Sequence, residues 1–212
     1  MRLDHVSYAA GPEGLDATAL ELASKLGVEL VDGGIHPRFG THNRVLPVSD
    51  GHYLEVVEVL DHPAADKVPF GQAVKARTEA GGGWLGWVVA VDDLRPIEAR
   101  LGRRAVDGNR RRPDGYELRW RQIGVKGLMS DPQLPFVVQW QVEDGLRPGA
   151  DKPSDVTIAG LQIAGDPARV TDWLGTPVGE PLVGIDVDWV HPRGTPGLLC
   201  VDFATRNGTV RL

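Results

Sequence analysis

The sequence predicts an α+β protein made of paired βαβββ modules that form a curved mixed sheet around an open cleft. Two observations predict this class. First, a short apolar strand, an acidic or proline-bearing turn, an amphipathic helix and a Leu-Gly pair follow one another at three places in the chain. Second, three strand-like runs follow the helix in each of the first two units. These units recur at a spacing of roughly 80 residues, which indicates an internal duplication.

The first module is expected over residues 1–62. Its predicted elements are a strand over 3–9, a helix over 15–26 and strands over 28–31, 45–48 and 53–60. The helix carries leucine and alanine at spacings that place them on one face. The pair Asp50-Gly51 predicts a tight hairpin between the last two strands.

A connecting segment over 63–83, with a short helix around 72–79, leads to the second module over 84–145. This module repeats the same order of elements. They are a strand over 84–91, a helix over 94–101 and strands over 104–106, 116–123 and 135–142. The repeat is the strongest organisational signal in the chain.

The remaining residues, 146–212, predict a partial third βαββ unit. A strand is expected over 156–164, a helix ends at Leu174, and two strands follow at 184–190 and 197–203. Asp166-Pro167 supplies the residues that favour a helix start, and Gly175 suits a helix end. In a dimerisation scaffold, this unit could cover an open edge of the sheet, since such an edge otherwise invites pairing with another chain.

Composition narrows the function classes. A net charge of −6 argues against nucleic-acid binding, which needs concentrated positive charge. No apolar stretch approaches the roughly 20 residues of a membrane helix, so we expect no membrane partner. A single cysteine, Cys200, excludes an intrachain disulfide and suits the cytoplasm.

The arginine run 110–112 ends in a Pro-Asp-Gly turn and is interpreted as a solvated loop. We expect a monomer or a homodimer.

Alternation along the strands brings two chemically active side chains together. Val6 and Tyr8 form the set that a helix should cover, so His5 faces the other side of the sheet. The same reasoning turns Glu55 toward the side of His5. A histidine and a carboxylate so placed can hold a divalent metal or serve as acid and base. The alternative is a hydrogen-bonded His–Glu pair in a wet cleft.

Two further segments could supply polar groups to the cleft. The glycine-rich segment around 33–43 can present His36, His42 and Asn43 as donors and acceptors, or it can merely satisfy its own backbone. Later in the chain, Arg119 and Arg121 alternate with apolar residues and face either the cleft or solvent. In the cleft, Arg121 could clamp a carboxylate or phosphate of a small ligand.

Four pieces of the sequence resemble the glyoxalase-like domain proteins of the vicinal oxygen chelate superfamily. They are Leu3-Asp4-His5-Val6, the segment 33–43, Tyr53-Leu54-Glu55 and the run 134–140. The resemblance covers about residues 1–145. It implies two βαβββ modules curled into an open cleft. In metal-bearing relatives, that cleft holds four ligands, one from the first and one from the last strand of each module.

Carried onto this sequence, the resemblance implies an incomplete ligand set. The first module keeps His5 and Glu55. In the second, aligning Val91 with Ala10 places Gly86 where His5 stands, and the last strand offers Gln139, whose amide brings no charge to offset a metal ion. Any divalent ion (Mn, Ni, Zn or Fe) would depend on His5 and Glu55, with His36 or His42 as a third ligand.

Two main functions follow from these residues. One is a small-molecule enzyme of lyase, isomerase or dioxygenase type, in which His5 and Glu55 bind a metal ion or act as acid and base. Substrate-binding roles are then expected for His36, His42, Asn43, Arg121 and Gln139. The other is a non-catalytic module of the same fold that binds or sequesters a small ligand. A dimerisation scaffold is a third alternative.

Overall fold

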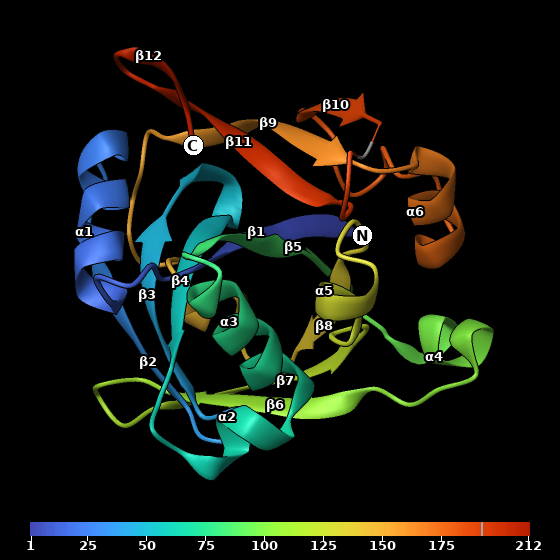
Figure 1. Ribbon diagram of the computed structural model, residues 1–212, viewed down its shortest axis with the longest axis horizontal. Helices are drawn as coiled ribbons and strands as arrows, with labels where there is room; N and C mark the ends of the chain where they lie inside the picture. Colours follow the sequence, from blue (N-terminus) through green and yellow to red (C-terminus); the bar gives the residue numbers. More distant parts are fainter. Residues whose placement is uncertain (192) are drawn as a thin grey trace.

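The computed structural model describes residues 1–191 and 193–212 as an α+β protein with two sheets (Figure 1). Among these residues, eight strands close into a barrel in the order β1-β4-β3-β2-β6-β7-β8-β5. Four strands form a second sheet in the order β10-β9-β11-β12, which lies across one side of the barrel. The α+β class and the curved sheet are confirmed, and the sheet closes on itself.

The first module and the connecting segment contain four strands and three α-helices. They are β1 (Arg2–Ala9), α1 (Leu15–Leu26), β2 (Val31–His36), β3 (Thr41–Pro47), β4 (Tyr53–Val59), α2 (Pro63–Lys67) and α3 (Pro69–Glu79). The helix α1 has the predicted bounds, and its apolar face is buried. It ends at Gly27, whose φ of 68° lies in the left-handed region that glycine adopts most readily.

The second module and the C-terminal unit contain the others. They are β5 (Gly83–Ala90), α4 (Arg95–Leu101), β6 (Val106–Arg111), β7 (Glu117–Ile123), α5 (Gly127–Ser130), β8 (Phe136–Trp140), β9 (Thr157–Ala164), α6 (Pro167–Leu174), β10 (Asp186–Val190), β11 (Gly197–Thr205) and β12 (Gly208–Arg211). The short strand β12 was not predicted, so the C-terminal unit has one strand more than expected.

Strand pairing shows the duplication directly. β1 pairs in parallel with β4, β5 pairs in parallel with β8, and β1 pairs antiparallel with β5 where the modules meet. An equivalent hydrogen bond closes each module. The Ala10 N–H donates to the Val57 carbonyl and the Val91 N–H donates to the Val138 carbonyl, both at 2.9 Å. The alignment of Val91 with Ala10 is therefore structurally correct.

The strands β2 and β6 begin later than predicted, and a glycine in β2 permits the close backbone approach that joins them. Gly34 was expected near a turn, but it lies inside β2 with a φ of 105°. A Cβ added there would lie 2.0 Å from the carbonyl oxygen of Arg111 in β6. The neighbouring Ile35 pairs with Arg111 and joins the two modules on the side opposite β1 and β5. Glycine at position 34 thus permits the barrel to close.

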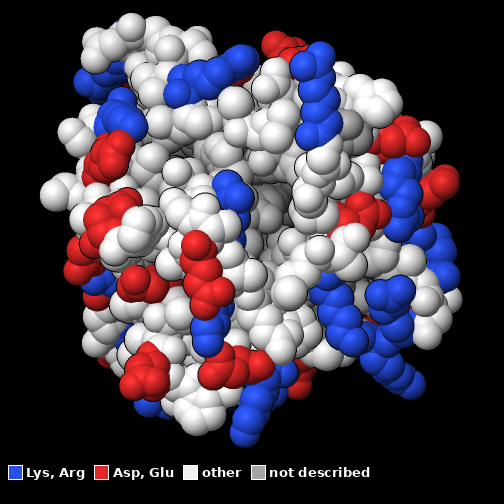
Figure 2. Space-filling view, in the orientation of Figure 1, with Lys and Arg blue, Asp and Glu red and all other residues white. Residues whose placement is uncertain are grey.

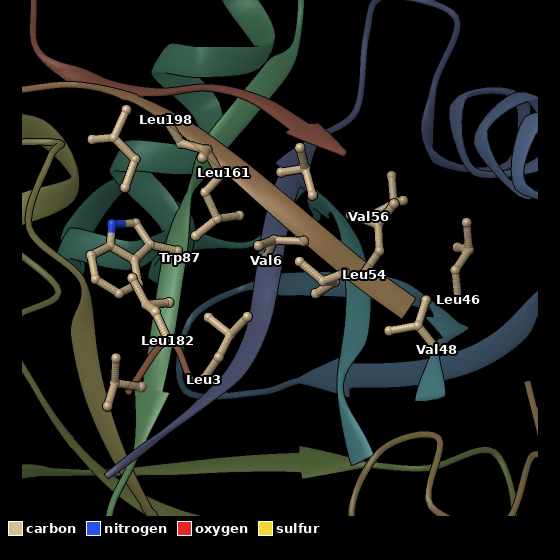
Figure 3. Packing of buried hydrophobic residues seen from close by; sticks show 14 of the residues in the cluster. Leu3, Val6, Leu46, Val48, Leu54, Val56, Trp87, Leu161, Leu182 and Leu198 are labelled. Atoms are coloured by element: carbon tan, nitrogen blue, oxygen red, sulfur yellow. The ribbon is translucent and has the colours of Figure 1, made fainter. Parts of the chain in front are cut away.

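Two hydrophobic clusters lie on opposite faces of the barrel wall. On the outer face, Leu161 and Leu198 of the second sheet pack toward Val6 and Trp87 (Figure 3). The inner cluster fills much of the barrel and includes Phe70, from the start of α3. The C-terminal unit therefore shares a core with the barrel. None of the helices in the described residues is long and apolar enough to cross a membrane.

Candidate functional site

A small cavity of about 30 Å³ lies inside the barrel. This volume accommodates one or two water molecules. The cavity is lined by side chains from both modules and from α3. They are His5, His36, Phe39, Tyr53, Glu55, Phe70, Arg110, Trp120, Gln122, Phe136, Val138 and Trp140. The predicted His5–Glu55 pair therefore faces one shared space, together with the predicted His36.

The Glu55 carboxylate is the most heavily supported group of the site. Its side chain is only 6% exposed. The Ser7 hydroxyl donates to Oε2 at 2.9 Å, and the Asn43 amide donates to Oε1 at 2.8 Å. Burial alone would raise the pKa of Glu55, but electrostatic interactions with His5 and His36 and these two hydrogen bonds outweigh it and lower the pKa. The group is consequently ionised at neutral pH.

His5 lies beside Glu55 and is oriented by an adjacent carboxylate. Its Nε2 is 3.8 Å from Oε2 of Glu55, and its Nδ1 is 2.9 Å from Oδ2 of the buried Asp4. The pairing of β1 with β5 shifts between Leu3 and His5. This irregularity accompanies a departure from simple alternation, in which Asp4 would face away from His5. Tyr53 stacks on the imidazole with a centroid distance of 4.4 Å.

His36 approaches the other oxygen of the same carboxylate. Its Nε2 is 3.9 Å from Oε1 of Glu55, and its Nδ1 is 2.9 Å from the Thr41 hydroxyl. Burial lowers the pKa of His36 to about 4, because little water remains to solvate the charged imidazole. His36 is thus neutral at physiological pH, and Glu55 lies between two imidazoles.

Arg110 is a site residue that the sequence did not identify. The predicted solvated loop at 110–112 is wrong for its first two residues, which belong to β6. Arg110 is only 4% exposed and lines the cavity. Its Nε has no hydrogen-bond partner, and none of the described carboxylates forms an ion pair with its guanidinium. The sequence carries no signal for this placement, because the burial of Arg110 depends on the pairing of β6 with β7.

The second module contributes aromatic groups where the first contributes polar ones. The hydrogen bonds of Ala10 and Val91 place Val138 at the position of Val57, and therefore Phe136 at the position of Glu55. Gly86 occupies the position of His5, as predicted. Gln139, which was expected to bind substrate, does not line the cavity: its amide oxygen accepts from the Leu94 N–H at 3.3 Å and its amide nitrogen donates to the Asp92 carbonyl at 2.8 Å. These contacts fix the start of α4, outside the cavity.

Two other predicted residues also lie outside the cavity. His42 alternates with the inward-facing Asn43 on β3, and its Nε2 lies 3.1 Å from Glu58. Arg121 forms an ion pair with Glu98 at 2.7 Å. It faces away from the cavity because Trp120 and Gln122 occupy the inward positions of β7. Asn43 does not line the cavity either, but it contacts the site through its hydrogen bond to Glu55.

The donor set does not fit the four-ligand metal centre implied by the resemblance. Within residues 1–191 and 193–212, no group of three or more His, Cys, Asp and Glu side chains is placed to hold a metal ion. Gly86 and Phe136 offer no ligand atom, and the cation of Arg110 shares the cavity, where it would repel a dication. The chemistry proposed below is therefore assigned to protein side chains.

The paired modules, closed around a buried His–Glu site, define a protein of the vicinal oxygen chelate class. Residues 3–178 match the family model described as the glyoxalase-like domain, and the chain belongs to that family. No curated protein matches the sequence.

Solved structures are similar to this chain at low identity. A hypothetical protein from Staphylococcus aureus is 16% identical with a TM-score of 0.64, over 99% of this chain and 84% of that one. Methylmalonyl-CoA epimerase from Mycobacterium tuberculosis is 19% identical (TM-score 0.45, 66% of this chain, 86% of that one). A Streptomyces coelicolor methylmalonyl-CoA epimerase variant is 21% identical (TM-score 0.45, 66% and 96%).

Proposed function

We propose that the protein is an acid–base enzyme of isomerase or lyase type that removes a proton next to a carbonyl group of a small substrate. The observation that carries the proposal is the shared cavity of an ionised Glu55, flanked by His5 and His36, and an Arg110 guanidinium that forms no ion pair with a described carboxylate. A base and a cation that share one buried space without forming an ion pair suit a reaction that creates an oxyanion.

Each residue then has a defined role. The carboxylate of Glu55 accepts the α-proton, and the electrons of the C–H bond move onto the carbonyl oxygen. Arg110 stabilises the resulting enolate oxygen, since a fixed cation acts strongly where water is scarce. His5, oriented by Asp4, provides the second acid–base group for proton return. Ser7 and Asn43 orient the carboxylate, and the neutral His36 lies beside it without competing for its proton.

The test is proton exchange with solvent. The protein is incubated in D₂O with a panel of 2-oxo acids, α-hydroxy ketones and acyl thioesters, and the α-C–H signals are followed by ¹H NMR. We expect exchange of at least one panel member, slowed about 10²-fold or more in Glu55→Gln. The matched control is His42→Gln, because His42 lies outside the cavity.

The outcome also separates the proposal from the alternative of a ligand-binding module. Ligand-induced shifts in the protein spectrum, with no exchange of any panel compound, would favour binding or sequestration. Equal exchange rates in the wild type and Glu55→Gln would remove Glu55 from the reaction.

A further inference from the structure

A larger groove adjoins the catalytic cavity. Its volume is about 810 Å³, and it shares Phe39, Phe70 and Gln122 with the lining of the small cavity. These three side chains therefore form the wall between the two spaces. The groove is within the size range of small-molecule sites, roughly 300–1,000 Å³. The inner cavity, at about 30 Å³, is too small for any substrate body.

The groove combines apolar walls with a basic rim. Its apolar lining includes Val68, Ile123, Val125 and the 56% exposed Val106. Of these, Ile123 and Val125 are buried and Val68 is half-buried, so the solvent-facing apolar surface of the groove is concentrated at Val106. The contributing segments are the start of α3, the start of β6 and the turn before α5.

Four cations and one carboxylate lie on this lining. The charged residues are Arg38, Arg103, Arg104, Lys126 and Asp107. Within the part of the chain that the structure describes, none of the four cations forms an ion pair. The carboxylate of Glu98, which acts electrostatically on Arg104, is instead bonded to Arg121 at 2.7 Å. Figure 2 shows several basic side chains near the segment that joins α4 to β6 in Figure 1.

We infer that the groove binds an amphipathic small anion, namely an apolar chain or ring that ends in a phosphate or carboxylate. The anionic end lies at the basic rim, because positive charge concentrated on a protein of net charge −6 selects for anions. The apolar body covers Val106 and Val125. This inference deepens the proposed function in one respect: the reacting end points toward Phe39 and Phe70, and these rings move aside to admit it to Glu55.

The probe for this groove is decyl phosphate, used below its micelle concentration and titrated by calorimetry at low salt. We expect Arg104→Gln/Lys126→Gln to bind it about tenfold more weakly than the wild type, a loss of two partly screened charge interactions. The control is Arg95→Gln/Arg119→Gln, which removes the same charge from residues outside the groove. Its affinity should equal that of the wild type.

Three further ligands test both halves of the groove. Decanoate shows whether a carboxylate replaces the phosphate, decanol should bind much more weakly, and butyl phosphate should lose affinity with its apolar chain. Absence of decyl phosphate binding, equal losses in both double variants, or equal affinity for butyl and decyl phosphate would overturn the inference. Glu55→Gln should still bind decyl phosphate, so failure of the acid–base proposal is distinguishable from failure of the groove.

Discussion

The Nε2 atom of His5 lies 3.8 Å from Oε2 of Glu55, and both side chains are enclosed by the barrel. This relationship joins the first and last strands of one module. Its counterpart in the second module is Gly86 and Phe136, so the duplicated fold has a polar half and an aromatic half. This asymmetry places a proton acceptor beside apolar aromatic side chains.

Replacement of the buried Arg110 should increase the stability of the fold and abolish the reaction. We expect Arg110→Met to raise the free energy of unfolding by about 1 kcal/mol, because an unpaired guanidinium is costly to bury. The same variant should lose solvent exchange of α-protons. Urea denaturation and the NMR assay measure the two effects. A less stable Arg110→Met would indicate that Arg110 has a structural role.

The free energy of unfolding should decrease as the pH falls, because of His36. The pKa of His36 is about 4 in the folded protein and 6.5 in an unfolded chain, so the unfolded state holds the extra proton between these values. The free energy of unfolding therefore decreases as the pH falls from 6.5 to 4, by up to about 3 kcal/mol from this residue.

The check is urea denaturation across that window for the wild type and His36→Asn, whose amide can retain a bond to Thr41. The variant should show a shallower slope with pH. The lowered pKa values of Asp4 and Glu55 act with the same sign, but from their ordinary values of 3.8 and 4.5 downward, so they affect only the acidic end of this window. Identical slopes in the two proteins would contradict the assignment to His36.

Added metal ions should leave the melting temperature of the protein unchanged. A site occupied at 100 times its Kd stabilises the folded state by about 2.7 kcal/mol. We expect no rise in Tm with Mn²⁺, Ni²⁺, Zn²⁺ or Fe²⁺, and no fall with a chelator, because the second module lacks ligand atoms and Arg110 repels a dication. A stabilisation that His5→Ala abolishes would instead support a metal site at His5 and Glu55.

Barrel closure should depend on Gly34. The Gly34→Ala change places a methyl group 2.0 Å from the Arg111 carbonyl, and we expect it to cost about 3 kcal/mol or more. The control is Gly115→Ala, which also has a positive φ but has open space around the added Cβ. That variant should lose only about 1 kcal/mol in urea denaturation. Equal losses of stability in the two variants would contradict the role of the β2–β6 contact in closing the barrel.

Periodicity was sufficient to predict the duplicated architecture and the pairing of His5 with Glu55. Strand alternation holds well within a module, where apolar and polar faces are distinct. For β8 the alternation holds, but the inward face was assigned wrongly: Phe136 and Val138 point into the barrel, and Gln139 points away from it. In a barrel, apolar side chains fill the inside as well as the outside, so an apolar set does not identify the helix-covered face.

Arg110 and Asp4 could not be placed by the same means. The run around Arg110 has the composition of an exposed turn, and its burial depends on the pairing of β6 with β7. Asp4 contacts His5 where the pairing of β1 with β5 shifts register. Both positions are set by contacts between segments distant in the chain.

The most direct test is the titration of the Glu55 carboxylate by ¹³C NMR in protein labelled at glutamate, with Glu55→Gln used to assign its signal. We predict that Glu55 titrates below its ordinary value of 4.5 and is fully ionised at pH 6. A Glu55 carboxyl that is still protonated at pH 6 would contradict the account, because the group could not then accept a substrate proton.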